Sequence, residues 1–259
     1  MKRREFLASS TVLGLTPWTM ANAAESPAGD RTYLELRMVH VETEAQRQGF
    51  EAFAREAAVP ALNRAGIKPV GVFYPEAGLS PIYVLLPHRS LDSVATLTQR
   101  LGEDADFRSR GAGFLETPVD RPAYVRVKSS LMVAFKGMPQ LKIPITSPNR
   151  IFQLRIYESP SVITGQKKIE MFNDAGEIEI FRRVGLHPVF FGETIVGPNM
   201  PNLTYMLSFE SQEERKANWG KFTADPDWQR LKKMNEYADK NILSKITNLF
   251  LRPAPCSQI

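Results

Sequence analysis

Two arginines occupy matching places in two similar segments, and they offer the clearest opportunity for chemistry. Arg37 lies two residues after Glu35, and Arg155 lies two residues after Gln153, each in an alternating run typical of a β-strand. A guanidinium group matches the two oxygens of a carboxylate, so either arginine could bind an anionic ligand. The structural alternative is an ion pair, with Glu35 as the partner of Arg37 and a carboxylate such as Glu193 as the partner of Arg155. The sequence allows both.

Acid–base residues are also available in the second segment. If that segment is catalytic, Arg155 would anchor an anion, Glu170 or Glu193 would transfer protons, and Tyr157 or Tyr205 would donate a hydrogen bond. Such roles require contacts of about 3 Å, or one bridging water, and spacing along the chain does not fix them. The sequence contains no nucleophile elbow, phosphate loop or dinucleotide fingerprint. The sequence therefore identifies neither a reaction nor a cofactor.

Two of the three histidines, His40 and His88, end predicted strands. If the first and third strands are parallel neighbours, both histidines lie at one edge of the sheet. Glu42 or Asp92 could then complete a metal site. The alternative, which we favour, is that the two histidines are unrelated and bind no metal.

A long turn between two predicted strands, residues 196–202, is the best loop candidate for a ligand contact, through Asn202. Functional loops often project from rigid scaffolds in this way. The alternative is a hairpin stiffened by proline and glycine that contacts no ligand.

Short motifs recur along the chain at a nearly constant spacing. The pairs are 36–37 with 154–155, 65–70 with 184–189, 82–85 with 204–207, and 104–107 with 225–228. Their offsets are 118, 119, 122 and 121 residues, far longer than the repeats of a solenoid. The pattern indicates two copies of one small domain, with function where the copies meet.

Each copy shows the order strand, helix, strand, strand, helix, strand, which is the ferredoxin-like βαββαβ plan. The first copy spans residues 31–128, a proline-containing linker spans 129–149, and the second copy spans 150–252. Ser211 with Glu214, and Asp225 with Pro226, are typical helix starts. We expect an α+β protein of the dimeric α/β-barrel type, with two antiparallel sheets packed face to face.

The alternation within the first strand of each copy separates an apolar face from a polar one. Leu34 and Leu36 share the face that we expect to pack on helices. Glu35 and Arg37 share the opposite face, which we expect to lie between the two sheets. The pattern does not show whether the sheets pair within one chain or between chains.

The first residues are typical of an export signal: a basic start, an uncharged stretch, and the small-residue site Ala21-Asn22-Ala23. Arg3 and Arg4 favour the twin-arginine pathway, with an ordinary secretory signal as the alternative. We therefore expect residues 1–23 to be removed and the protein to be periplasmic or otherwise exported.

Composition excludes several classes of protein. Loss of residues 1–23 would lower the net charge only from +5 to +3, and no basic run with interleaved aromatics is present, so nucleic-acid binding is not expected. The single cysteine, Cys256, cannot form an internal disulfide. After signal removal, no stretch approaches the roughly 20 apolar residues that a membrane span requires.

A string of motifs in the second copy resembles a bacterial NIPSNAP domain. The motifs occupy residues 155–159, 168–173, 179–186, 188–193, 200–206, 217–219 and 225–228. The first copy is similar only in outline and lacks the Met-Pro-Asn-Leu turn. The resemblance implies a dimeric α/β-barrel fold and carries no established catalytic residues.

Three functional hypotheses follow from these observations. The first is an exported NIPSNAP-type protein that binds a small ligand or a protein partner, through Arg37, Arg155, Tyr157 or Asn202. The second is a barrel enzyme resembling monooxygenases, haem proteins or isomerases, with a cavity between the sheets. The third is an interaction module that works through homo-oligomerisation.

Overall fold

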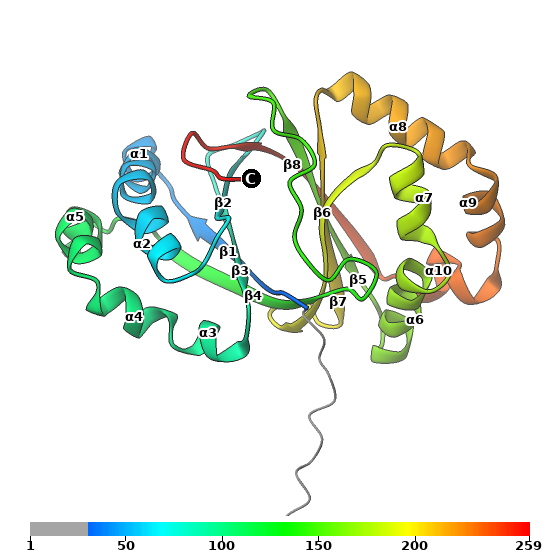
Figure 1. Ribbon diagram of the computed structural model, residues 1–259, viewed down its shortest axis with the longest axis horizontal. Helices are drawn as coiled ribbons and strands as arrows, with labels where there is room; N and C mark the ends of the chain where they lie inside the picture. The colour runs from blue at the N-terminus through cyan, green and yellow to red at the C-terminus, as the bar shows by residue number, and fades with distance from the viewer. Residues whose placement is uncertain (1–30) are drawn as a thin grey trace, which may run out of the picture.

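The computed structural model describes residues 31–259, so the predicted export signal lies outside the described residues. Eight antiparallel strands form one closed barrel with helices outside it (Figure 1). The strands are β1 (Tyr33–His40), β2 (Gly71–Pro75), β3 (Ile82–His88), β4 (Arg126–Ala134), β5 (Ile151–Glu158), β6 (His187–Val196), β7 (Asn202–Phe209) and β8 (Lys245–Pro253).

The helices form two groups, one on each side of the barrel in Figure 1. The first group comprises α1 (Glu44–Phe53), the π-helix η1 (Ala54–Ala58), α2 (Val59–Arg64), α3 (Leu91–Ala95), α4 (Leu97–Glu103) and α5 (Ala105–Leu115). The second comprises α6 (Val162–Asn173), α7 (Glu177–Arg183), α8 (Gln212–Ala224), α9 (Pro226–Leu231), the 3-10 helix η2 (Asn235–Tyr237) and α10 (Asp239–Ile242).

The strand order around the barrel is β1-β3-β2-β8-β5-β7-β6-β4. Residues 31–134, here called the first half, contribute β4-β1-β3-β2, and residues 151–259, the second half, contribute β8-β5-β7-β6. The halves join edge to edge, through β2 with β8 and through β4 with β6. The expectation of two separate sheets packed face to face is therefore wrong. Hydrogen bonds at both edges join the two sheets into one barrel within one chain. β4 ends at Ala134, six residues beyond the predicted domain boundary.

Side-chain caps fix where the main helices begin. Thr43 and Ser161 cap α1 and α6 with capping boxes, and Ser90 and Ser211 cap α3 and α8. Each cap satisfies a backbone N–H that the first helical turn leaves without a partner. The predicted start at Asp225 is also confirmed: its carboxylate accepts from the N–H groups of the next turn.

The barrel interior is a packed apolar core. Leu34, Leu36, Phe152 and Leu154 point inward, and Ile259 at the C-terminus is fully buried among them. The expectation that this face packs on helices is wrong. A closed eight-stranded barrel has an interior that side chains fill, so the more uniformly apolar face lies inside. No described helix has the length and apolarity to cross a membrane.

Candidate functional site

Because the apolar face lies inside the barrel, the polar face of β1 and of β5 points outward, under the helices. Arg37 is on the same face as Val39, which belongs to the core between sheet and helices in the first half. Arg155 shares its face with Tyr157, which belongs to the corresponding core of the second half. The two arginines therefore lie in separate layers on opposite sides of the barrel, not together between two sheets.

Arg37 is neutralised by a neighbour on its own strand. Its Nε and Nη2 donate to the two carboxylate oxygens of Glu35 at 2.7 and 2.9 Å. Ser129 donates to the same carboxylate at 2.8 Å, and the Nε2 of the buried His88 lies 3.4 Å from it. Arg37 and Glu35 therefore form an ion pair, the second of the two possibilities that the sequence allowed.

This carboxylate is held in its charged form. Burial opposes ionisation of Glu35, but the neighbouring His88, Arg37 and Ser129 favour the carboxylate more strongly and lower its pKa from 4.5 to about 2. Among the described residues, the Arg37 side chain donates through Nε and Nη2, and none of its hydrogen bonds uses Nη1. The guanidinium therefore keeps free donor capacity while its net charge is compensated.

Arg37 lies at the wall of a large cavity between the first-half sheet and its helices. The cavity has a volume of about 850 Å³. Most of its lining is aliphatic or aromatic and comes from β1, β2, β3, α1, η1, α2, α4 and α5. A π-helix contributes Ala54 and Ala58 to the wall, and such turns are frequent at functional sites. This is a size and polarity typical of small-molecule sites.

The cavity lies where small side chains stand in place of aromatic ones of the second half, at Val72, which matches Phe191 in the strand register, and at four further positions. The α1 and α6 caps are 118 residues apart, and the α3 and α8 caps are 121 apart. With these offsets and the strand registers, the matched pairs are Val39 with Tyr157, Ala54 with Phe172, Val84 with Tyr205, and Thr98 with Trp219. Val84 lies opposite Arg37 and Tyr205 lies opposite Arg155, so the offset between β3 and β7 is 121, and the offset of 122 predicted from the sequence is one residue too long. All four first-half members line the cavity.

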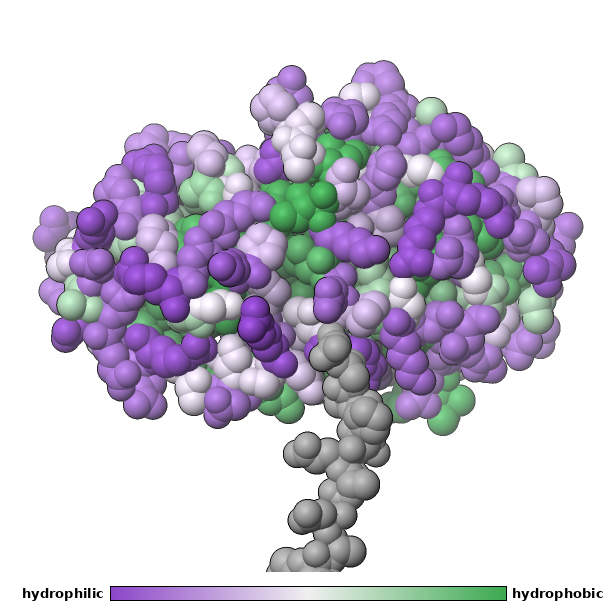
Figure 2. Space-filling model, viewed as in Figure 1, coloured by the Kyte–Doolittle hydropathy of each residue, from purple (hydrophilic) through white to green (hydrophobic). Residues whose placement is uncertain are grey.

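One side of the cavity is formed by the chain between α5 and β4. Leu115, Val119 and Tyr124 line the cavity and are 44%, 99% and 39% exposed. Apolar side chains that reach both the cavity and the solvent provide an apolar entrance. The face of the molecule in Figure 2 is mainly hydrophilic over both helical layers.

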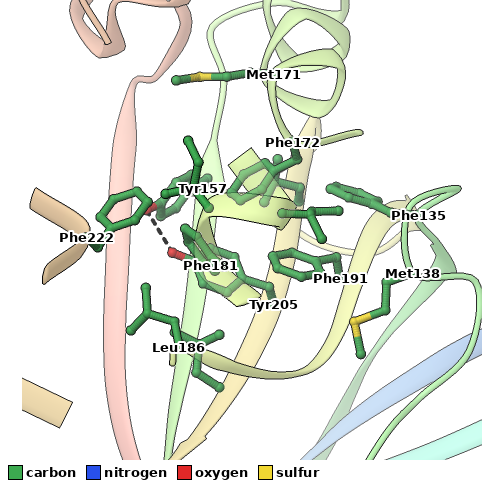
Figure 3. Close-up of a cluster of buried hydrophobic side chains, with 14 of the residues drawn as sticks. Phe135, Met138, Tyr157, Met171, Phe172, Phe181, Leu186, Phe191, Tyr205 and Phe222 are labelled. Carbon is green, nitrogen blue, oxygen red and sulfur yellow. Dashed lines mark hydrogen bonds between the residues drawn. The ribbon is translucent and has the colours of Figure 1, made fainter. Parts of the chain in front are cut away.

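The corresponding space in the second half is filled by aromatic rings. Phe172, Phe181, Phe191 and Tyr205 pack with ring centroids 5.2 to 5.9 Å apart (Figure 3). The hydroxyl groups of Tyr157 and Tyr205 are hydrogen-bonded at 3.0 Å, the contact that is dashed in Figure 3. Packing of this kind leaves Tyr205 fully buried.

The remaining acid–base candidates lie apart from both arginines. Glu170 accepts from the Tyr237 hydroxyl at 2.7 Å and pairs with Lys167 on the surface of α6. Glu193 faces a separate cavity of about 270 Å³, which Glu170 also lines, and forms no ion pair with Arg155. Spacing along the chain could not show this separation, because α6 carries Glu170 away from the strand that holds Arg155.

Asn202 closes the turn that contains it. Its side chain accepts from Thr194 at 2.6 Å and donates to the carbonyls of Pro198 and Asn199 at 3.0 Å each. These bonds use the whole amide group, so its visible role is to fix the 197–201 turn.

The expectation that His40 and His88 share one edge is wrong. β1 and β3 run antiparallel, with Tyr33 opposite His88, while His40 lies at the far end of β1, opposite Arg126. The strand order requires this: two parallel strands joined through a helix enclose a third strand that runs the other way. Among residues 31–259, no three His, Cys, Asp or Glu side chains are placed to hold a metal ion.

Comparisons with known proteins agree with this architecture. Residues 152–258 match the NIPSNAP family. A NIPSNAP family protein from Agrobacterium tumefaciens is 20% identical; the match covers 42% of this chain and 98% of that one, with a TM-score of 0.38. No curated protein matches the sequence. The NIPSNAP match therefore applies to the second half.

Longer matches reach both halves. A candidate monooxygenase from Lactobacillus acidophilus is 9% identical with a TM-score of 0.57, over 86% of this chain and 94% of that one. A candidate chlorite dismutase is 10% identical with a TM-score of 0.51, over 88% and 96%. At these identities the likeness shows the fold alone: a mixed α+β fold of the dimeric α/β-barrel type.

Proposed function

We propose that this protein binds a small, neutral, largely apolar molecule in the first-half cavity. The observation that carries the proposal is the 850 Å³ space left where small side chains replace the aromatic residues of the second half. An apolar cavity with a few polar groups at its wall is the usual form of a ligand site. The NIPSNAP-like second half would then serve as the filled counterpart that completes the barrel.

The polar groups at the wall define the kind of ligand. Glu35 compensates the charge of Arg37. The other two charged residues of the lining, Arg108 and Glu116, are exposed and opposite in charge, so the site offers hydrogen-bond donors without a net positive charge. A hydroxyl or carbonyl oxygen can accept from Arg37 Nη1, whereas a carboxylate would meet the repulsion of Glu35. The ligand class is therefore an apolar body that carries a neutral oxygen.

The lining favours binding over catalysis. Among the described residues that line the cavity there is no His, Cys, Ser or Lys, and Tyr124 and Glu116 lie at its exposed side. The fold relatives include candidate oxidative enzymes, so oxidation of the bound molecule in this cavity is the second candidate function. Recovery of an oxygenated product after aerobic incubation would favour it over binding alone.

Binding can be tested with a series of straight-chain alcohols from hexanol to dodecanol. Each added methylene should strengthen binding about fourfold, because burial of one CH₂ contributes about 0.8 kcal/mol. The gain should stop at the chain length that fills the cavity. Calorimetric titration would measure the dissociation constant of each alcohol.

Filling the cavity provides the matched variant. Ala54→Phe with Thr98→Trp restores two residues of the second-half pattern, so the longest alcohol that still gains affinity should become shorter. Val84→Phe should act in the same way from the sheet side, which guards against a folding defect in the first variant. Ala217→Trp, at an exposed position on α8, is the control. Equal chain-length limits in filled and control proteins would refute the site.

We also infer a tandem duplication and export. The strand order β4-β1-β3-β2 and its counterpart β8-β5-β7-β6, with repeated caps, support two ferredoxin-like copies.

Arg3, Arg4 and the small-residue site at 21–23 support export through the twin-arginine pathway. Replacement of both arginines by lysine should then retain the protein in the cytoplasm, as cell fractionation would show. Unchanged export would favour the ordinary secretory pathway.

A further inference from the structure

Arg155 is the counterpart of Arg37, but its charge has no partner. Within the described residues, no carboxylate lies within 4.0 Å of its guanidinium, and its buried Nε has no hydrogen-bond acceptor. Only this Nε is withdrawn from water, and a buried N–H without an acceptor is costly to a fold. A ligand that accepts hydrogen bonds from the guanidinium would offset this cost.

The residue that could have neutralised Arg155 is occupied elsewhere. Gln153 stands where the first half has Glu35, two residues before the arginine. Its amide nitrogen donates to Asn248 at 2.8 Å, and its oxygen accepts from the Trp219 indole at 2.7 Å. Gln153 thus positions the Trp219 indole and forms no hydrogen bond with Arg155.

Aromatic rings surround the guanidinium and orient it. Its Cζ lies 4.8 Å from the centre of the Trp219 ring, 5.3 Å from that of Tyr157 and 6.0 Å from that of Tyr205. Ring faces attract a cation, but they do not replace oxygen acceptors for its N–H groups. The two tyrosine hydroxyls bind each other at 3.0 Å, and among the described residues neither accepts a hydrogen bond from Arg155.

A buried carboxylate of the same half, that of Glu177, is already paired with another cation. Glu177 is almost fully buried on α7 and pairs with Lys168 at 3.1 Å, and Asp239 lies 3.8 Å from the same lysine. This pair satisfies a second buried cation beside Tyr157. Burial opposes the charge of Arg155, but Tyr205, Tyr157, Glu177 and Asp239 nearby outweigh it and raise the pKa of Arg155. What the guanidinium lacks is a hydrogen-bond acceptor in direct contact.

We propose that Arg155 and Trp219 form a second ligand site, which takes the carboxylate of a small organic acid. Two parallel N–H···O bonds match the guanidinium fork to a carboxylate. Arg155 and Trp219 are both partly exposed, so an acid can approach from solvent. Ordering by the Trp219 ring favours a planar acid over a compact anion.

Benzoate is the probe, and benzamide, which has the same shape without the charge, is its control. The full chain would be titrated with each while the indole N–H signal of Trp219 is followed by NMR, assigned with Trp219→Phe. We expect saturable binding of benzoate and at least tenfold weaker binding of benzamide. Equal responses to both would overturn the proposal.

Three variants separate a ligand site from a packing role. Gln153→Glu supplies the carboxylate that the first half has, so benzoate binding should weaken at least tenfold while the fold is retained. Arg155→Gln should do the same. Arg230→Gln, at an exposed arginine on α9 outside both proposed sites, should leave benzoate binding unchanged. A loss of thermal stability in Arg155→Gln with undiminished benzoate binding would assign Arg155 to packing and refute the site.

Discussion

The two halves of the barrel share a backbone plan and differ in what fills the space under their helices. In the first half, an arginine is paired with a carboxylate and the space beside it is hollow. In the second half, aromatic rings fill the space and the arginine has no charge partner. Exchanges at a few matched positions, such as Val84 for Tyr205 and Glu35 for Gln153, account for both differences. One scaffold can thus present a neutral apolar cavity on one side and an unpaired cation on the other.

The largest effect is expected where the second half is made to resemble the first. Phe172→Ala removes a fully buried ring from the aromatic core and should lower the free energy of unfolding by about 3–5 kcal/mol. The reverse exchange, Ala54→Phe, projects into an existing cavity and should change it by less than about 1.5 kcal/mol. Urea unfolding of both variants measures the difference. Comparable losses would mean that the first half is not hollow in solution.

Glu35 gives the first half a pH dependence that Gln153 cannot give the second. The pKa of this carboxylate is lowered from 4.5 to about 2, so its stabilisation is present above pH 4.5 and is lost as the pH falls toward 2. A shift of that size corresponds to about 3 kcal/mol.

Glu35→Gln should therefore lower the free energy of unfolding near pH 7 by up to that amount and flatten the curve between pH 4.5 and 2. Gln153→Ala, a neutral change at the matched position, should leave the slope of that curve intact. Chemical unfolding at a series of pH values tests both, and an unchanged acid slope in Glu35→Gln would contradict the assignment.

Gln153→Glu should produce a smaller and opposite change. A carboxylate beside Arg155 reproduces the pair of the first half, and a hydrogen bond between charged groups contributes about 1.5–3 kcal/mol, less the contacts that Gln153 loses. We expect a net gain of about 1 kcal/mol at pH 7 that disappears in acid. A loss of stability at every pH would show that Arg155 is not free to pair.

Local features were predictable from the sequence, and global ones were not. Ser211 and Asp225 fix helix starts through their own side chains, so the sequence reveals them. The two faces of β1 were separable by alternation, but both are buried, and only barrel closure determines that Leu34 lies inside. The placement of His40 and His88 required the direction of neighbouring strands, which no local pattern encodes.

The cavity was the least visible feature, because an empty volume depends on residues that come together from distant segments. A signal did exist. Alignment of the two copies at offsets of 118 and 121 places Val39 against Tyr157 and Thr98 against Trp219. A consistent loss of ring volume at positions on one face predicts a hollow layer. The burial of Lys168 and Glu177 could not be predicted from the sequence, because a charged pair on two helices is usually exposed.

The most direct test of the division between the halves is an NMR titration of one sample, first with decanol and then with benzoate. The account predicts that decanol shifts amide signals of the cavity lining in β1, β3, α1 and α4 and leaves the Trp219 indole signal in place. Benzoate should then shift the Trp219 indole signal while decanol stays bound. If decanol shifts signals of the second half instead, or if benzoate displaces decanol, the two halves do not hold the separate sites described above.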